Sequence, residues 1–585
     1  MENLIRSAKD GSIEALMILS LQSRNNQRAH QAFFRVMEEN LRFDTPSIQA
    51  MKRGSLPLIP STDPKDVLNR SCTSLLALVT GLHNQSLSLE DIASSLFALI
   101  PAISFWLCLF FEHIILPSRA PEFKCIDFHH AVVYILSWTT KPNTLEIMEP
   151  KLLRDYLPFL WFHPPPGCTK YNLEDSRSIF AAVYIMILSP EWMDILIRRL
   201  EEDSTVTANL IVQFIVDEFA HIPEESDTRL IYQSFLTVAT PVLQFSLHSP
   251  PVHTALLKNN SARWISRVLR FVTRRARFTD VTLHLAADCV SKCLFYLRKV
   301  IQDGHSYVYQ LLGHDLLLYL LKVFRNLHTH PELVNEETKE AMNHVEDHTM
   351  NILQLIASHF AYASILKRSQ KAISKIQRDR VDLFLGPTDP GLKRVCETWT
   401  KFVAVAFFPS DIPRSITDPF CGHGQCPRTS AGKFMVCSGC QFTLYCSRIC
   451  QKEDWSSGDH RSLCTEIRQL RNDGGPLPMS FSDRRAVESL NSRYVEYYKQ
   501  GSSEWNKLLD RYIVANGDPD PLWPLVLILH YRALLIEPEV GIESSQRCIK
   551  DPEIIAKARE GAGILVYWII VDGQSFVKKA ELVDL

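Results

Sequence analysis

The cysteines of this chain are concentrated in one short segment, and this constrains the local fold more than any other feature of the sequence. Seven of the 15 cysteines lie in the 44 residues from Cys421 to Cys464, within a chain of 585 residues. The opening residues, MENLIRSAKD, include acidic side chains and no small-residue cleavage site, so no secretory signal is predicted. Outside the secretory route, a dense cysteine cluster indicates a metal site instead of a disulfide framework. We therefore expect an intracellular protein, in the cytoplasm or the nucleus, with a metal-binding segment.

The candidate metal ligands of this segment fall into four closely spaced pairs. The pairs are Cys421-x4-Cys426, Cys437-x2-Cys440, Cys446-x3-Cys450 and His460-x3-Cys464. Zinc takes four nitrogen or sulfur ligands in a tetrahedron, and such spacings let one loop or one helical turn supply two of them. Eight ligands complete two closed sites, which leave no position for water and are therefore structural. The alternative, that these cysteines are small hydrophobic core residues, is opposed by their clustering and by their spacing.

The stretch CSGCQFTLYCSRICQKEDWSSGDHRSLC resembles the MYND-type zinc finger. The resemblance is carried by the CSGC knuckle, the YC-x3-CQ-x3-W segment and the final H-x3-C, and it covers residues 421–464 only. It implies a cross-brace of two interleaved zinc sites. In that arrangement the first zinc is held by Cys421, Cys426, Cys446 and Cys450, and the second by Cys437, Cys440, His460 and Cys464.

Two features of the segment depart from the usual pattern of the family. The first cysteine pair is spaced more widely than usual, and four residues separate Trp455 from His460, which is also more than usual. The wider first gap contains His423, which could replace Cys426 as a ligand. Cys426 is the preferred interpretation, because thiolates suit such a site.

The resemblance also implies a binding function. MYND fingers are protein-interaction modules that take short proline-containing peptides, and the family's peptide-contacting positions match Ser438, Gln451 and Trp455. Trp455 could instead cap the small core between the two sites. Both interpretations can hold, because tryptophan is amphipathic and common at interfaces.

The charge of the segment does not favour nucleic acid. It has five Lys or Arg and three acidic side chains, so with seven thiolates and two zinc ions its net charge is about −1. The whole chain has a formal net charge of −2. A module that binds phosphates needs a basic face. We therefore expect protein or peptide partners and no direct nucleic-acid binding.

Residues 1–395 predict helices throughout. Apolar residues recur at helical spacing in stretches of a few turns, separated by Pro, Asn, Asp or Ser. Many consecutive helices with short connections favour an irregular, armadillo-like helical array of the α-solenoid kind, in which no fixed repeat period is present. The clearest stretches are Met193–Leu200, Leu210–Phe219, Leu256–Val272, Val281–Leu297, Leu311–Phe324 and Met350–Ile365.

The expected fold class is mostly α. One region lies between the first 395 residues and the cysteine segment, and another follows that segment. Residues 396–420 predict a connecting helix and loop, and residues 465–585 a C-terminal helical region. Residues 482–538 predict helix. The β-branched and aromatic run Ile564–Gly573, followed by FVKKAEL, predicts a possible β-hairpin.

One segment raises the question of a membrane span. Ile92–Phe111 is uncharged over 20 residues, which is long enough to cross a bilayer. Pro101 lies in its middle, Glu112 follows directly, and no Lys or Arg flanks it closely. A helix buried in a large helical core is therefore the favoured interpretation, and a membrane association is not expected.

Two helices are predicted to carry a basic face. Such a face could bind an acidic partner or nucleic acid, but the solvated outer face of a solenoid helix is the favoured interpretation. The first set is Arg263, Arg267, Arg270, Arg274 and Arg277, and the second is Lys367, Arg368, Lys371, Lys375 and Arg378.

No catalytic motif is found in the sequence. A Walker loop, GxGxxG and GxSxG are absent, and the glutamate between His344 and His348 is not placed as metalloproteases require. SET-type lysine methyltransferases with an inserted MYND finger need an Asn-His pair after the finger, and none follows Cys464. We therefore expect a non-enzymatic zinc-binding scaffold or adaptor. A nuclear transcriptional co-regulator is the alternative, and a SET-type methyltransferase is less favoured.

Overall fold

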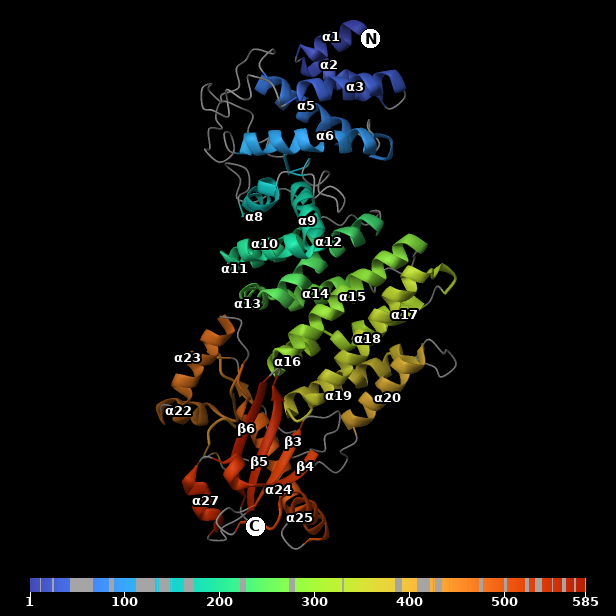
Figure 1. Ribbon diagram of the computed structural model, residues 1–585. Helices are drawn as coiled ribbons and strands as arrows, with labels where there is room; N and C mark the ends of the chain where they lie inside the picture. Colours follow the sequence, from blue (N-terminus) through green and yellow to red (C-terminus); the bar gives the residue numbers. More distant parts are fainter. Residues whose placement is uncertain are drawn as a thin grey trace. The chain divides into compact units, whose positions relative to one another are not determined.

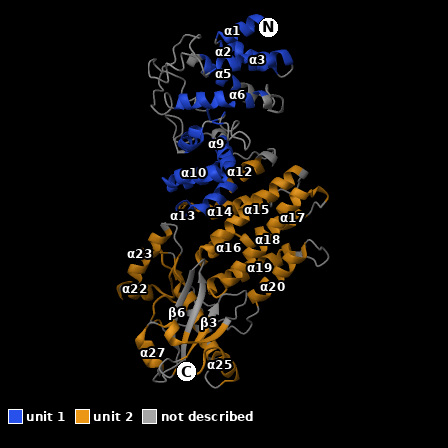
Figure 2. Cartoon of the chain, in the orientation of Figure 1, with its two compact units in different colours: residues 1–226, 240–253 blue, residues 227–239, 254–585 orange. Residues whose placement is uncertain are grey.

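The chain folds into two compact units that are mostly helical (Figures 1 and 2). One unit comprises residues 1–226 and 240–253, and the other residues 227–239 and 254–585. The computed structural model describes residues 1–10, 12–23, 26–42, 67–83, 89–111, 132–133, 135, 148, 150–162, 173–220, 228–272, 279–328, 331–384, 392–407, 421–424, 426, 434–440, 442–457, 459–472, 477–498, 502–520, 525–531, 539–549, 551–559, 564–572 and 575–583.

The first unit is a succession of helices in which local sequence signals set the ends. Asn26 caps α3, because its Oδ1 accepts from the backbone N–H groups of Arg28 at 3.0 Å and Ala29 at 3.2 Å. Pro190 begins α10, a position where its missing N–H costs nothing. The elements are α1 (Glu2–Lys9), α2 (Ile13–Ser23), α3 (Gln27–Asn40), α5 (Val67–His83), α6 (Leu89–Phe110), the π-helical η3 (Leu152–Tyr156), α8 (Leu157–Phe162), α9 (Leu173–Ile187), α10 (Pro190–Glu201) and α11 (Ser204–Ala220). In the sequence, α12 (Thr228–His248) and α13 (Pro250–Lys258) cross the boundary between the units.

The segment that raised the question of a membrane span lies in α6 and the residue after it. Pro101 lies inside this helix. Ile103 and Trp106 are buried, and the Trp106 indole N–H donates to the carbonyl of Leu41 at 2.9 Å. Among the helices that the structure describes, none combines the length and the hydropathy that crossing a bilayer requires.

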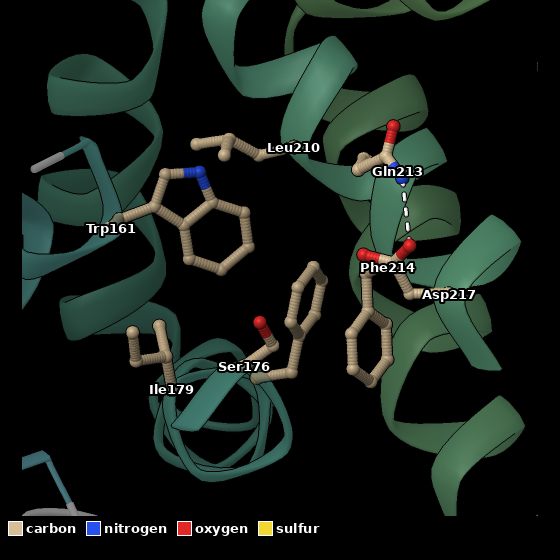
Figure 3. A pocket seen from close by; sticks show the side chains of 8 residues that line it. Trp161, Ser176, Ile179, Leu210, Gln213, Phe214 and Asp217 are labelled. Atoms are coloured by element: carbon tan, nitrogen blue, oxygen red, sulfur yellow. Dashed lines mark hydrogen bonds between the residues drawn. The ribbon is translucent and has the colours of Figure 1, made fainter. Parts of the chain in front are cut away.

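A small cavity lies between α8, α9 and α11 (Figure 3). Its volume is about 40 Å³, and the rings of Trp161, Phe180 and Phe214 form much of its wall. Phe180 stacks on Phe214 at a ring-centroid distance of 4.3 Å. Ligand pockets for small molecules measure roughly 300–1,000 Å³, so this cavity has room for a few water molecules only.

The second unit begins with a block of helices packed along one another. The α15 and α18 helices form its centre (Figure 1), and Leu297, Val345 and Ile352 are fully buried there. Each unit by itself contains an irregular succession of helices, as expected from the sequence, and this is compatible with an armadillo-like arrangement. The elements are α14 (Ser261–Val272), α15 (Asp280–Gln302), α16 (His305–Gly313), α17 (Leu316–His328), η4 (Pro331–Leu333), α18 (Glu336–Ser358), α19 (Ala363–Arg378), η5 (Val381–Phe384) and α20 (Lys393–Phe407).

A buried histidine at this centre makes the block sensitive to acid. His348 of α18 lies edge-on to Phe295 of α15, with ring centroids 5.0 Å apart. Burial, followed by the positive charge of Arg298 and the neighbouring His344, lowers the pKa of His348 to about 4, although Asp347 acts in the opposite direction. The folded chain therefore keeps this imidazole neutral at a pH where the unfolded chain, with an ordinary histidine pKa, takes up a proton.

We expect His348→Leu to reduce the loss of stability of the block on acidification. The unfolded state binds the additional proton between about pH 6.5 and pH 4, so stability falls as the pH falls through that window. From about pH 7 to pH 5 the loss from this one group is about 2 kcal/mol. This loss of stability is measured by hydrogen exchange of α15 and α18 at both pH values, corrected for the pH dependence of the intrinsic exchange rates. Equal losses in the parent and the variant would show that His348 is not the responsible group.

The C-terminal part combines helices with a four-stranded sheet in the order β4-β3-β5-β6. The predicted hairpin is present, since β5 and β6 pair antiparallel with Asp572 opposite Ser575. The β3 strand pairs antiparallel with β4 and parallel with β5. The elements are α24 (Phe481–Tyr497), α25 (Ser503–Asn516), β3 (Leu525–Tyr531), β4 (Glu539–Ser544), α26 (Ser545–Cys548), α27 (Pro552–Arg559), β5 (Ile564–Asp572) and β6 (Ser575–Val583).

The prediction of helix over residues 482–538 is wrong for Leu525–Tyr531, and residues 532–538 lie outside the described residues. The run LVLILHY forms β3, an inner strand of the sheet, in which Val526, Leu527 and Leu529 are fully buried. A strand buried on both faces is a continuous apolar run without alternation, and periodicity alone cannot distinguish it from a buried helix. The preceding prolines, in the sequence PLWP, are the signal that favours a strand.

Candidate metal centre

The cysteine segment folds around a short antiparallel β-pair and two helices. The β1 strand (Met435–Val436) pairs with β2 (Leu444–Tyr445), and α22 (Arg448–Ser457) and α23 (Asp459–Asn472) follow. The turn of the CSGC knuckle lies between the strands. Gly439 in this turn is required by a close approach, because a Cβ there would lie 2.8 Å from the Cys464 sulfur. The knuckle and α23 can therefore approach closely enough to share one metal ion.

Cys437, Cys440, His460 and Cys464 form one group of four converging ligand atoms, all buried. The Cys437 sulfur lies 3.9 Å from the Cys464 sulfur and 3.3 Å from His460 Nε2, and Nε2 lies 3.9 Å from the Cys440 sulfur. A zinc–sulfur bond of about 2.3 Å gives tetrahedral edges of about 3.8 Å between sulfur atoms. The group therefore fits one zinc ion, with three sulfur ligands and one nitrogen ligand.

Cys421, Cys426, Cys446 and Cys450 form the second group. The Cys426 and Cys446 sulfurs are 3.5 Å apart, those of Cys446 and Cys450 3.6 Å, and those of Cys450 and Cys426 3.8 Å. These distances again match the edges of a zinc tetrahedron. Cys421 is buried, whereas the other three cysteines are half-buried. The two groups are the interleaved pairs that the cross-brace requires, and they account for two zinc ions.

The structure decides between His423 and Cys426. Cys426 belongs to the group of four sulfurs, whereas His423 gathers with Cys450 and Glu453 beside it. His423 Nδ1 lies 3.8 Å from a Glu453 carboxylate oxygen. His423 is therefore a neighbour of the first zinc site and Cys426 is its ligand.

The knuckle is arranged to stabilise a thiolate. Burial acts to raise the pKa of the Cys437 thiol, but hydrogen bonds from the Cys440 backbone, from His460 and from the Gly439 backbone outweigh it and lower that pKa to about 6. Burial, followed by the charge of Cys440 and Cys437, raises the pKa of Cys464 to about 12. Adjacent thiolates repel one another without a cation between them, so the full ligand set favours a divalent metal.

Two residues that the sequence analysis did not single out hold the finger together. The Tyr445 hydroxyl donates to a carboxylate oxygen of Asp454 at 2.6 Å, and both residues are buried. The Tyr445 ring also lies edge-on to the His460 ring, with centroids 5.5 Å apart. The position of Tyr445, directly before the zinc ligand Cys446, is the sequence signal for this role. The sequence analysis instead offered Trp455 as the residue that caps the core between the zinc sites. Tyr445 is the aromatic residue that fills the small core.

The predicted peptide-contacting positions lie on the surface around this core. Gln451 and Trp455 are one helical turn apart on α22, so they share a face, and Ser438 is exposed on the knuckle turn. Trp455 is 43% exposed, although its ring also contacts His460 at a centroid distance of 5.8 Å. Val436, Ile449 and Leu463 are further exposed large hydrophobic residues of the finger.

A segment after the finger connects it to the helical block. Leu477 packs against the buried cluster around the zinc ligands, and its backbone N–H donates to the Ser306 hydroxyl at 3.3 Å. Ser306 lies in the first turn of α16. Arg471, near the end of α23, donates to the Cys440 carbonyl at 2.8 Å. The finger therefore contacts the α16 helix through Leu477, next to the buried cluster that contains the Cys437 group.

Comparison with known proteins agrees with this geometry. No solved structure matches the chain at a significant level. The family model described as the MYND finger matches residues 421–464, which contain all eight ligands. This match is confined to one segment and says nothing about the family of the whole chain. Residues 421–464 are a MYND finger, a zinc-binding and protein-interaction domain, with two zinc sites.

Proposed function

We propose that this chain is a non-enzymatic intracellular adaptor whose finger binds a short proline-containing peptide through Ser438, Gln451 and Trp455. The observation that carries the proposal is the division of roles between two aromatic residues. Tyr445 is buried between the ligands, whereas Trp455 lies on the surface of α22 with 43% of its area exposed. An exposed tryptophan on a rigid, metal-braced scaffold is typical of a binding anchor.

The composition of the finger surface supports a peptide ligand. Exposed apolar side chains accompany Trp455, and the finger as a whole is close to neutral when loaded with zinc. Hydrophobic residues next to a few polar side chains match the chemistry of a proline-containing segment, which is apolar and already extended. Gln451 and Ser438 offer hydrogen bonds to its backbone.

The absence of catalysis is part of the proposal. Each zinc group has four protein ligands, and a catalytic zinc normally has three and keeps one position for water or substrate. Both ions are accordingly assigned a structural role. Their contribution is to fold the segment, on the order of 10 kcal/mol per site.

We expect Trp455→Ala to retain both zinc ions and to lose peptide binding. Truncation of a central aromatic anchor costs about 2 kcal/mol, which corresponds to roughly a thirtyfold loss of affinity. A peptide array of proline-containing sequences identifies a ligand for the full chain. Fluorescence anisotropy then gives the affinity, and elemental analysis the zinc content of the same samples.

Val514→Ala is the matched control, because Val514 of α25 is an exposed apolar residue outside the finger. It should bind like the parent chain. The proposal is wrong if Trp455→Ala binds like the parent with zinc intact, or if no peptide of the array binds the parent. Loss of zinc in Trp455→Ala would instead show that Trp455 is a core residue.

A further inference from the structure

Two basic helices that are far apart in the sequence meet at one end of a third helix. Both α14 and α19 pack against α16. Arg263 and Arg267 are exposed on α14, and Arg368 lies on α19. The sequence analysis considered each helix by itself, and there a solvated outer face was the simpler interpretation. Arg274 and Arg277 of the first set lie outside the described residues.

The position of Arg368 is fixed by several contacts with α16. Its guanidinium carbon lies 3.6 Å from the centroid of the Tyr309 ring, and its Nη1 donates to the Tyr309 carbonyl at 2.6 Å. A Cβ on Gly313 would lie only 2.6 Å from this Nη1 atom. The guanidinium is therefore held at the C-terminal end of α16, where the helix dipole favours a cation.

On α14, Arg267 is likewise held over an aromatic ring. The guanidinium carbon of Arg267 lies 4.3 Å from the centroid of the Trp264 ring. None of the ion pairs among the described residues involves Arg263 or Arg267. The nearby Asp315 carboxylate is already paired with Lys375 at 3.0 Å. The positive charge of these arginines is therefore available to a partner.

The charges that act on His314, next to the end of α16, agree with the packing of α14 and α19 on this helix. Burial, followed by the charges of Arg263, Arg368 and Arg267, lowers the pKa of the His314 imidazole, and the charge of Asp315 acts in the opposite direction. Three guanidinium groups from two helices thus act on one side chain.

We propose that Arg263, Arg267 and Arg368, with the exposed Tyr309 under the Arg368 guanidinium, form a docking surface for an acidic protein segment. We call it the α14–α19 basic surface. A guanidinium held over an aromatic ring loses less side-chain freedom on binding, and its planar fork matches a carboxylate. Tyr309 is exposed beside these groups and offers apolar contact area.

The same contacts argue against nucleic acid. Single-stranded nucleic acid binds by stacking its bases on free aromatic faces, but Trp264 and Tyr309 each already have a guanidinium over the ring. Isolated carboxylates on a peptide are the better match for a small cluster of oriented arginines.

The test is the affinity of the full chain for a fluorescent poly-glutamate peptide at low salt. We expect Arg267→Glu/Arg368→Glu to weaken binding by about tenfold or more, because it replaces attraction by repulsion at the same place. The control is Arg28→Glu/Arg35→Glu on α3, which makes the same change of net charge at two exposed arginines. This control should bind like the parent.

Two further variants distinguish a loss of the binding surface from a loss of folding. Arg263→Glu changes an exposed side chain, so it should weaken binding even if the double variant fails to fold, as judged by circular dichroism. Val514→Ala should bind poly-glutamate like the parent, because Val514 of α25 lies outside both proposed binding surfaces. The inference is overturned if the parent does not bind, if the α3 control loses as much affinity, or if the parent prefers single-stranded poly-dT.

Discussion

Replacing Cys446 with alanine is expected to lower the zinc content of the purified chain from two ions to one. The Cys446 sulfur lies within 3.6 Å of two other ligand sulfurs, so its loss removes one corner of a compact tetrahedron. A structural zinc site contributes on the order of 10 kcal/mol to folding, and a site with three remaining ligands retains only part of that. Peptide binding should fall as well, because Cys446 lies two residues before the helix that carries Gln451 and Trp455.

Elemental analysis and limited proteolysis of the variant measure this effect. Cys548→Ala is the control, since Cys548 is a free cysteine in α26, outside the finger. It should keep two zinc ions and the resistance of the parent to protease. A Cys446→Ala chain that still holds two ions against a chelator would rule out the assigned ligand set.

The second large effect is expected at Asp483, which joins two distant helices. Its buried carboxylate accepts hydrogen bonds from the Ser364 backbone N–H at 2.9 Å, the Ser364 hydroxyl at 3.1 Å and the Ser480 hydroxyl at 2.6 Å. Ser480 caps α24, and Ser364 lies in the first turn of α19. Asp483→Ala removes these charge-assisted bonds and leaves half-buried donors without an acceptor, at a cost of about 3 kcal/mol.

Hydrogen exchange of α19 and α24 reports this loss locally. Asp483→Asn should be intermediate, because it keeps an acceptor oxygen but loses the charge. Asp510→Ala, which changes an exposed carboxylate of α25, should have no effect. Unchanged protection of both helices in Asp483→Ala would show that the contact contributes nothing to their association.

The metal centre was predictable because its information is local. The eight ligands lie within 44 residues, and the spacing within each pair follows from the tetrahedron that zinc requires. The choice between His423 and Cys426 needed the structure, because both lie on the same loop and only their position relative to Cys446 and Cys450 separates them. Helices in the first part of the chain were predictable for the same reason, since periodicity is a local property.

Features that depend on distant pairs were not predictable. Asp483 and Ser364 are 119 residues apart, and nothing in either local sequence indicates the other. The α14–α19 basic surface exists only because both helices pack on α16. The β3 strand was mistaken for helix because its apolar run fits both structures, and only its pairing with β4 and β5 decides between them. Tertiary contacts, not propensity, determine these parts of the fold.

The two zinc groups differ in burial, and this has a chemical consequence. All four ligands of the Cys437 group are buried, whereas three of the four cysteines of the Cys421 group are half-buried. Oxidation of cysteine follows thiolate character and access to solvent. An oxidant such as hydrogen peroxide therefore meets the Cys426, Cys446 and Cys450 sulfurs first, and zinc leaves that side of the finger while the other stays loaded. The finger would lose its two ions in a fixed order under oxidative stress.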